Sequence, residues 1–123
     1  MGDPGPDAAG PEAAAIEAVR REFVAGLPAR LAVLRSALAE LVRGYTRPAA
    51  ETFYYRAHAL KGTAASFGAD ELVSPATALA QAGRRWLETG ALAPGTAVAT
   101  RELERLAAAI ERYRARAART EAP

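Results

Sequence analysis

The sequence predicts an all-α protein folded as an antiparallel four-helix bundle. Alanine, leucine, glutamate and arginine dominate its 123 residues, and all four favour helices. Aromatic residues make up only 7% of the chain, and no run is rich in the β-branched residues that favour strands. Apolar residues recur every three or four positions, as in an amphipathic helix. The length suits one domain with a single core.

The N-terminal part is expected to be a tail followed by a helical extension. Residues 1–10 are rich in Gly, Pro, Asp and Ala and have little apolar surface to bury, so we expect them to be disordered. Helical spacing of apolar residues begins near Pro11. Pro28 interrupts it, because a proline inside a helix removes a hydrogen bond. Either a new helix starts there or one long helix is kinked.

Beyond Pro28, leucines spaced by three and four predict a helix that ends near Gly44. A second helix is expected over residues 48–67, with Gly68 as its stop. The apolar stripes of these two helices are Leu27, Leu31, Leu34, Leu38 and Leu41, and then Phe53, Ala57, Leu60, Ala64 and Phe67.

A third helix is expected to end at Gly90, and the pattern leaves two starts open, Asp70 or Ser74-Pro75. A fourth is expected over residues 96–118. Their inward stripes are Leu72, Ala76, Leu79, Gly83, Trp86 and Leu87, and then Ala99, Leu103, Leu106, Ile110 and Tyr113.

The short loops make consecutive helices antiparallel neighbours. We therefore expect an up-down-up-down bundle over residues 11–118, with a C-terminal tail at 119–123. One four-helix core can satisfy all the apolar stripes, which favours a monomer.

The composition argues against several functions. The formal net charge is only +2. The arginines near the C-terminus have no aromatic platforms between them, so they indicate a solvated helix face and not a nucleic-acid site. The chain contains no cysteine, which excludes disulfides and thiolate metal sites. It has neither the run of about 20 apolar residues that crosses a membrane nor a secretory signal. We expect a soluble, cytoplasmic protein.

One stretch differs from the rest of the chain. His58 is the only histidine, and Lys61 is the only lysine, since the other basic residues are all arginines. On a helix, positions i, i+3 and i+4 are neighbours, so His58, Lys61 and Gly62 share one face. At about 100° per residue, His58 lies about 140° from the apolar stripe of its helix. The histidine is therefore expected to face away from the core.

An exposed histidine has, in most proteins, no function. Here, however, Gly62 costs a helix interior about 1 kcal/mol relative to alanine, in a chain that uses alanine freely. Gly62 and Ala65 leave a shallow clearing around the imidazole, and Lys61 supplies a cation. Neutral imidazole is a nucleophile near pH 7, and a lysine can balance phosphoryl charge. This pattern suits a phosphorylated histidine.

The segment from His58 to Leu72 resembles the signature of histidine-containing phosphotransfer (HPt) domains. That signature reads H-x-L-K-G, small residues, an aromatic residue or leucine before glycine-alanine, and a leucine three residues on. The matching positions are His58, Leu60, Lys61, Gly62, Phe67, Gly68, Ala69 and Leu72. The segment from Phe23 to Leu34 is similar to the family's second-helix region. Ser74-Pro75 departs from the family pattern.

The resemblance implies that His58 accepts a phosphoryl group from a receiver-domain aspartyl phosphate and passes it to another receiver aspartate. Lys61 would stabilise the phosphoryl group, Gly62 would leave clearance for the partner, and Gly68 would permit the turn into the next helix. Such a carrier has no kinase activity and no cofactor of its own, because the receiver supplies Mg²⁺. The implied partners are receiver domains and a sensor histidine kinase, hybrid or separate. Candidate receiver contacts are Tyr54, Tyr55, Ala65 and Ser66.

Alternatives remain at this point. The chain could be the phosphoacceptor domain of a larger histidine kinase, labelled by that kinase's own catalytic domain. It could also be a helical adaptor that binds receiver domains without phosphorylation, although such an adaptor would not need His58, Lys61 and Gly62 together. An independent enzyme is disfavoured, since one histidine without a base partner makes no active site.

Overall fold

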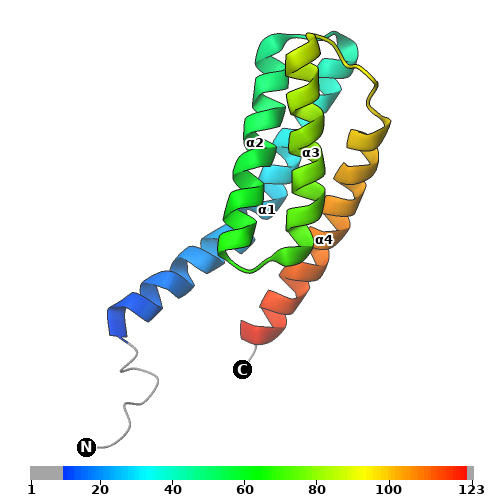
Figure 1. Cartoon of the computed structure of the whole chain (residues 1–123). Helices are drawn as coiled ribbons and strands as arrows, with labels where there is room; N and C mark the ends of the chain where they lie inside the picture. Colours follow the sequence, from blue (N-terminus) through cyan, green and yellow to red (C-terminus); the bar gives the residue numbers. More distant parts are fainter. Residues whose placement is uncertain (1–9, 122–123) are drawn as a thin grey trace, which may run out of the picture.

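The computed structural model describes residues 10–121, and this part of the chain is an all-α four-helix bundle (Figure 1). The helices run up, down, up and down, as predicted, and each packs against its two neighbours in the ring. Nine of the ten residues expected to form a tail lie outside the described residues. The helices are α1 (Gly10–Arg43), α2 (Arg47–Ser66), α3 (Asp70–Thr89) and α4 (Ala97–Glu121).

The N-terminal extension is the first part of α1 and not a separate helix. A single α-helix of 34 residues runs through Pro28. Because Pro28 is exposed, the Val24 carbonyl that loses its amide partner is within reach of water. The blue N-terminal part of α1 projects past the end of the bundle (Figure 1). Ile16 and Val19 lie on it and are 60% and 51% exposed, so they do not extend the core.

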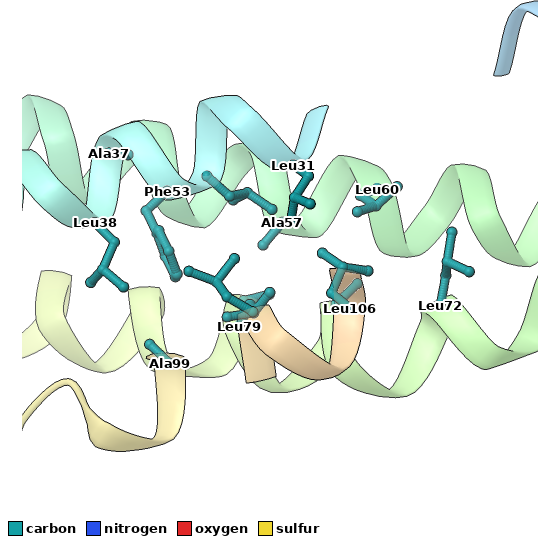
Figure 2. Close-up of a cluster of buried hydrophobic side chains, with 14 of the residues drawn as sticks. Leu31, Ala37, Leu38, Phe53, Ala57, Leu60, Leu72, Leu79, Ala99 and Leu106 are labelled. Atoms are coloured by element: carbon teal, nitrogen blue, oxygen red, sulfur yellow. The ribbon is translucent and has the colours of Figure 1, made fainter. Parts of the chain in front are cut away.

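The predicted apolar stripes form the core, except that Phe67 and Leu87 are only half-buried and pack against its edge. All five leucines of α1 are buried, as are the inward residues predicted for α4. Figure 2 shows side chains from all four helices converging between the ribbons, Leu31 and Leu38 from α1 among them. In α2 and α3 many buried positions are small, whereas Trp86 fills the space beside Phe53, with their ring centroids 5.1 Å apart.

The turn between α2 and α3 is closed by backbone hydrogen bonds. The amide of Gly68 donates to the carbonyl of Ala65 over 3.1 Å, and that of Ala69 donates to Ala64 over 2.9 Å. These are the two bonds of a Schellman motif, whose C′ residue has a left-handed conformation. Gly68 has φ +68°, which glycine adopts without steric penalty. The turn therefore directs the chain straight back along α2.

Of the two possible starts for α3, the structure has the earlier one, at Asp70. Pro75 lies inside the helix and is buried. Leu72 before it and Ala76 after it are fully buried, so packing of both residues keeps the turn helical across the proline. Helix α4 continues to Glu121, three residues beyond the expected end.

An aromatic cluster fixes the end of the bundle where this turn lies. Phe23 of α1 stacks on Phe67 with ring centroids 4.9 Å apart, and meets Tyr113 of α4 edge-on at 6.1 Å. Arg20 lies over the Phe67 ring at 5.8 Å, a cation–π geometry. The cluster connects α1, α4 and the end of α2. Within residues 10–121, no helix is long and apolar enough to cross a membrane.

Candidate functional site

His58 lies in the middle of α2 on its exposed side. The residue before it, Ala57, and the residue two positions after it, Leu60, are both fully buried. The helix is therefore oriented by its apolar stripe, and that stripe turns the imidazole outward. This arrangement agrees with the direction expected from the helical wheel.

The imidazole borders a shallow groove between α2 and α3. The groove has a volume of about 190 Å³. Helix α2 contributes Tyr54, His58 and Lys61 to its lining, and α3 contributes Thr77, Ala80, Gln81 and Arg84. The exposed histidine therefore has neighbours from two helices, and does not lie on the surface of α2 alone.

The groove carries positive charge from both helices. Lys61 is half-buried, and within residues 10–121 it has no ion-pair partner. The Arg84 guanidinium bonds the Glu88 carboxylate over 3.1 Å, but both side chains are largely exposed. An exposed pair of this kind is weak, so the arginine can reorient toward an anion in the groove. An anionic group on the imidazole would meet one cation from each helix.

Tyr54 is the residue in closest ring contact with the histidine. The two ring centroids are 5.8 Å apart and the planes differ by 26°, a stacked arrangement. Tyr54 also meets the Tyr55 ring edge-on, with centroids 5.0 Å apart. Tyr54 is half-buried in the groove, whereas Tyr55 is 60% exposed. The two tyrosines predicted as partner contacts therefore have different surroundings.

Gly62 is exposed and faces open space. A Cβ atom built on Gly62 would meet no atom within 4 Å apart from its chain neighbours and its own helix backbone. The fold thus has room for a side chain there, and the absence of one leaves the surface beside His58 low. Ala65, one turn further along the same helix, is also exposed.

Hydroxyl groups near the site are bonded to their own helices. Ser66 donates to the carbonyl of Gly62 over 3.1 Å, and Thr63 donates to Ala59 over 2.9 Å. Thr77, in the groove lining, donates to the carbonyl of Val73 over 2.7 Å. Ser66 is exposed, as a partner contact must be, but its hydroxyl proton is already engaged.

The α3 side of the groove was not predicted from the sequence. Thr77, Gln81 and Arg84 follow the i, i+4, i+7 spacing of one helix face. This polar face is the sequence pattern that could have indicated the α3 side of the groove. Assigning it to the histidine required knowing which face of α3 adjoins α2. Among the residues that the structure describes, no three His, Asp or Glu side chains are grouped as a metal site requires.

The fold and the site define a class of protein: a helical bundle that presents an accessible histidine beside two cations, on a face open to a partner. A family model, the Hpt domain, matches residues 18–116. The chain belongs to the Hpt domain family, as its signature indicated. Neither the curated proteins nor the solved structures give a match.

Membership of this family gives the chain a general role in histidine phosphotransfer within a phosphorelay. Hpt domains are phosphocarriers and not kinases, and they interact with receiver domains of two-component systems.

Proposed function

We propose that the chain is a phosphoryl carrier in which His58 accepts the group from a receiver-domain aspartyl phosphate and returns it to the aspartate of another receiver. The observation that carries the proposal is the position of His58, exposed in the middle of α2 at a groove that Lys61 and Arg84 also line. The family match supports the same role.

The imidazole of His58 is the only nucleophile that the transfer step requires. The lone pair of an unprotonated ring nitrogen forms an N–P bond while the P–O bond of the acyl phosphate breaks. The bonding electron pair leaves with the aspartate carboxylate, and the other ring nitrogen keeps its proton. The reverse step regenerates an acyl phosphate on the next receiver.

Lys61 and Arg84 act electrostatically in this proposal. A phosphoryl group on His58 carries about two negative charges near neutral pH, and both cations line the groove beside it. Cations placed where negative charge develops stabilise the transition state. Gly62 admits the partner surface, and Tyr55, Ala65 and Ser66 are proposed to contact it. The Mg²⁺ ion that assists transfer is proposed to come with the receiver.

The test is transfer of labelled phosphate from a phosphorylated receiver domain. The wild type should acquire a label that is lost in acid and stable in base, the behaviour of a phosphorus–nitrogen bond. The variant His58→Gln should acquire none. Since His58 is the only histidine, and this variant retains Lys61 and every arginine, persistence of the label in it would overturn the assignment.

Further arms of the same experiment separate the alternatives. ATP and Mg²⁺ alone should give no label, because the chain is proposed to lack kinase activity. Chelating Mg²⁺ should stop transfer from the receiver. A label obtained from a kinase catalytic domain without any receiver would favour the kinase-linked phosphoacceptor. Receiver binding without any label would favour the adaptor.

Lys61→Ala tests the electrostatic part of the proposal. Loss of this half-buried cation should slow transfer by about two- to five-fold, the range measured for solvent-accessible charge pairs, or shorten the lifetime of the phosphohistidine. Its thermal midpoint should stay near that of the wild type. Identical transfer rates and lifetimes would remove Lys61 from the mechanism.

A further inference from the structure

Tyr54 holds a position that a surface contact alone would not require. It lies one helical turn before His58, and residues at i and i+4 are neighbours on a helix. Its ring is stacked on the imidazole, with centroids 5.8 Å apart and planes 26° from parallel. One face of the phosphoacceptor ring is therefore covered by a neighbour from its own helix.

The backbone beneath Tyr54 is fixed by the closest approach of α3. A Cβ atom on Gly83 would lie 3.0 Å from both Cα and Cβ of Tyr54, and 3.2 Å from a ring carbon of Phe53. Nine in ten real Cβ contacts are longer than these, so glycine at position 83 lets the two helices meet here without a shift of the Tyr54 backbone. The close packing against α3 therefore holds the Cα and Cβ atoms of Tyr54 in place.

The Tyr54 ring has a second aromatic neighbour. Tyr55 meets it edge-on at 5.0 Å between centroids, and Tyr54 itself is half-buried in the groove lining. Aromatic pairs in stacked and edge-on geometries attract each other beyond simple area burial. The order Tyr55, Tyr54, His58 is therefore a short series of ring contacts that ends on the imidazole.

An exposed histidine with no such neighbour samples several staggered χ1 and χ2 combinations. Only some of them place a ring nitrogen at the groove that Lys61 and Arg84 line. We infer that Tyr54 is a positioning residue, which holds the His58 imidazole in the orientation that faces this groove. The inference rests on the proposed function and adds that Tyr54 acts within the chain, before any receiver is present.

Four proteins test this inference: the wild type, Tyr54→Leu, Tyr54→Phe and Tyr45→Leu. Leucine removes the ring, and phenylalanine keeps it without the hydroxyl. Tyr45→Leu is the matched control, because Tyr45 is also half-buried but lies outside the groove lining and, within residues 10–121, has no ring contact with Tyr54 or His58. Circular dichroism establishes that each variant is folded.

The first measurement is the NMR spectrum of the His58 ring protons, which needs neither phosphate nor partner. A stacked aromatic ring shifts these protons by its ring current. Tyr54→Leu should abolish the shift, whereas Tyr54→Phe and Tyr45→Leu should retain it. Unchanged ring-proton shifts in a folded Tyr54→Leu protein would overturn the inference.

The second measurement is labelling by phosphoramidate, a small donor that involves no docking surface. Its P–N bond breaks and ammonia leaves, while the imidazole nitrogen forms the new N–P bond. Tyr54→Leu should react about two- to five-fold more slowly, as expected when one of several rotamer wells is no longer favoured. Tyr54→Phe should restore the wild-type rate, and Tyr45→Leu should match it.

The outcomes separate this inference from the proposed function. Slow transfer from a receiver with normal phosphoramidate labelling would make Tyr54 a docking contact only. A Tyr54→Phe protein as slow as Tyr54→Leu would assign the effect to the hydroxyl, and would also overturn the stacking argument. No label on the wild type from any donor would overturn the proposed function, while the ring-proton shifts would still decide whether Tyr54 orients His58.

Discussion

The α2/α3 interface and the α1/α4 interface of the same bundle are built differently. At the first, Gly83 meets the backbone of Tyr54, and the groove at its surface is small. At the second, three larger hollows of about 350, 570 and 440 Å³ follow the length of the helix pair. Most buried residues of α1 are leucines, whereas alanine and glycine are frequent at the buried positions of α2 and α3.

This difference shows how residue size positions a site. Small residues let two helices approach closely, so side chains from both can line one narrow groove. That is how Gln81 and Arg84 of α3 come to share a groove with His58. Larger residues hold helices apart at the core and leave surface hollows between them. In this chain the close interface is the one that carries His58 and the groove at which we propose phosphotransfer.

The largest expected effect comes from placing the same large side chain at each interface. Gly83→Leu should destabilise the protein by about 1–3 kcal/mol or more, because its Cβ alone would press on the Tyr54 backbone and the rest of the side chain would overpack the interface. Ala39→Leu adds comparable bulk beside the hollow lined by Leu38, Val42 and Leu103, and should change stability by less than about 0.5 kcal/mol. Urea unfolding measures both. Equal losses would contradict the contrast between the interfaces.

A smaller effect is expected at two helical glycines where an added Cβ atom would face open space. Gly62→Ala and Gly26→Ala should each stabilise the protein by about 0.5–1 kcal/mol through helix propensity, since neither Cβ would meet an atom within 4 Å. Only Gly62→Ala should slow transfer from a phosphorylated receiver, because its methyl group would lie on the surface that we propose the receiver approaches.

Phosphoramidate labelling supplies the control for Gly62→Ala. A small donor has no docking surface to obstruct, so the rate should stay at the wild-type value. If receiver transfer by this variant is as fast as in the wild type and in Gly26→Ala, the glycine has no role in partner approach.

The smallest expected effect distinguishes two arginines, each of which lines a hollow and forms an exposed ion pair. Arg84 pairs with Glu88 at the α2/α3 groove, and Arg35 lies 3.9 Å from Glu104 across α1 and α4. Arg84→Ala should slow transfer by about two- to five-fold through loss of a cation, and Arg35→Ala should not. Both should unfold at the wild-type urea concentration. Equal transfer rates would mean that Arg84 does not act on the phosphoryl group.

Much of this fold was predictable from the sequence, because long amphipathic stripes with short loops determine a bundle. The stripe on α2 also fixed the outward direction of His58. The continuity of α1 was not predictable. Pro28 weakens the helix locally, and only the burial of Leu27 and Leu31 on either side shows that packing prevails. The start of α3 was left open for a similar reason, since burial around Pro75 decides it.

The site was predicted on one side only. His58, Lys61 and Gly62 are close in sequence, so helical spacing alone brings them together. Arg84 lies 26 positions after His58 in the sequence, and its place depends on the approach of α3 to α2. The stacking of Tyr54 on His58 was equally inaccessible, because spacing allows a contact between them but does not give the angle between two rings.

The hydrogen bond from Thr77 to the Val73 carbonyl bears on which groups can serve an anion in the groove. Thr77 lines the groove, but its hydroxyl proton is directed to the backbone over 2.7 Å. In the proposed function, a phosphoryl group on His58 would therefore take its hydrogen bonds from the two flexible cations, Lys61 and Arg84, and not from this hydroxyl.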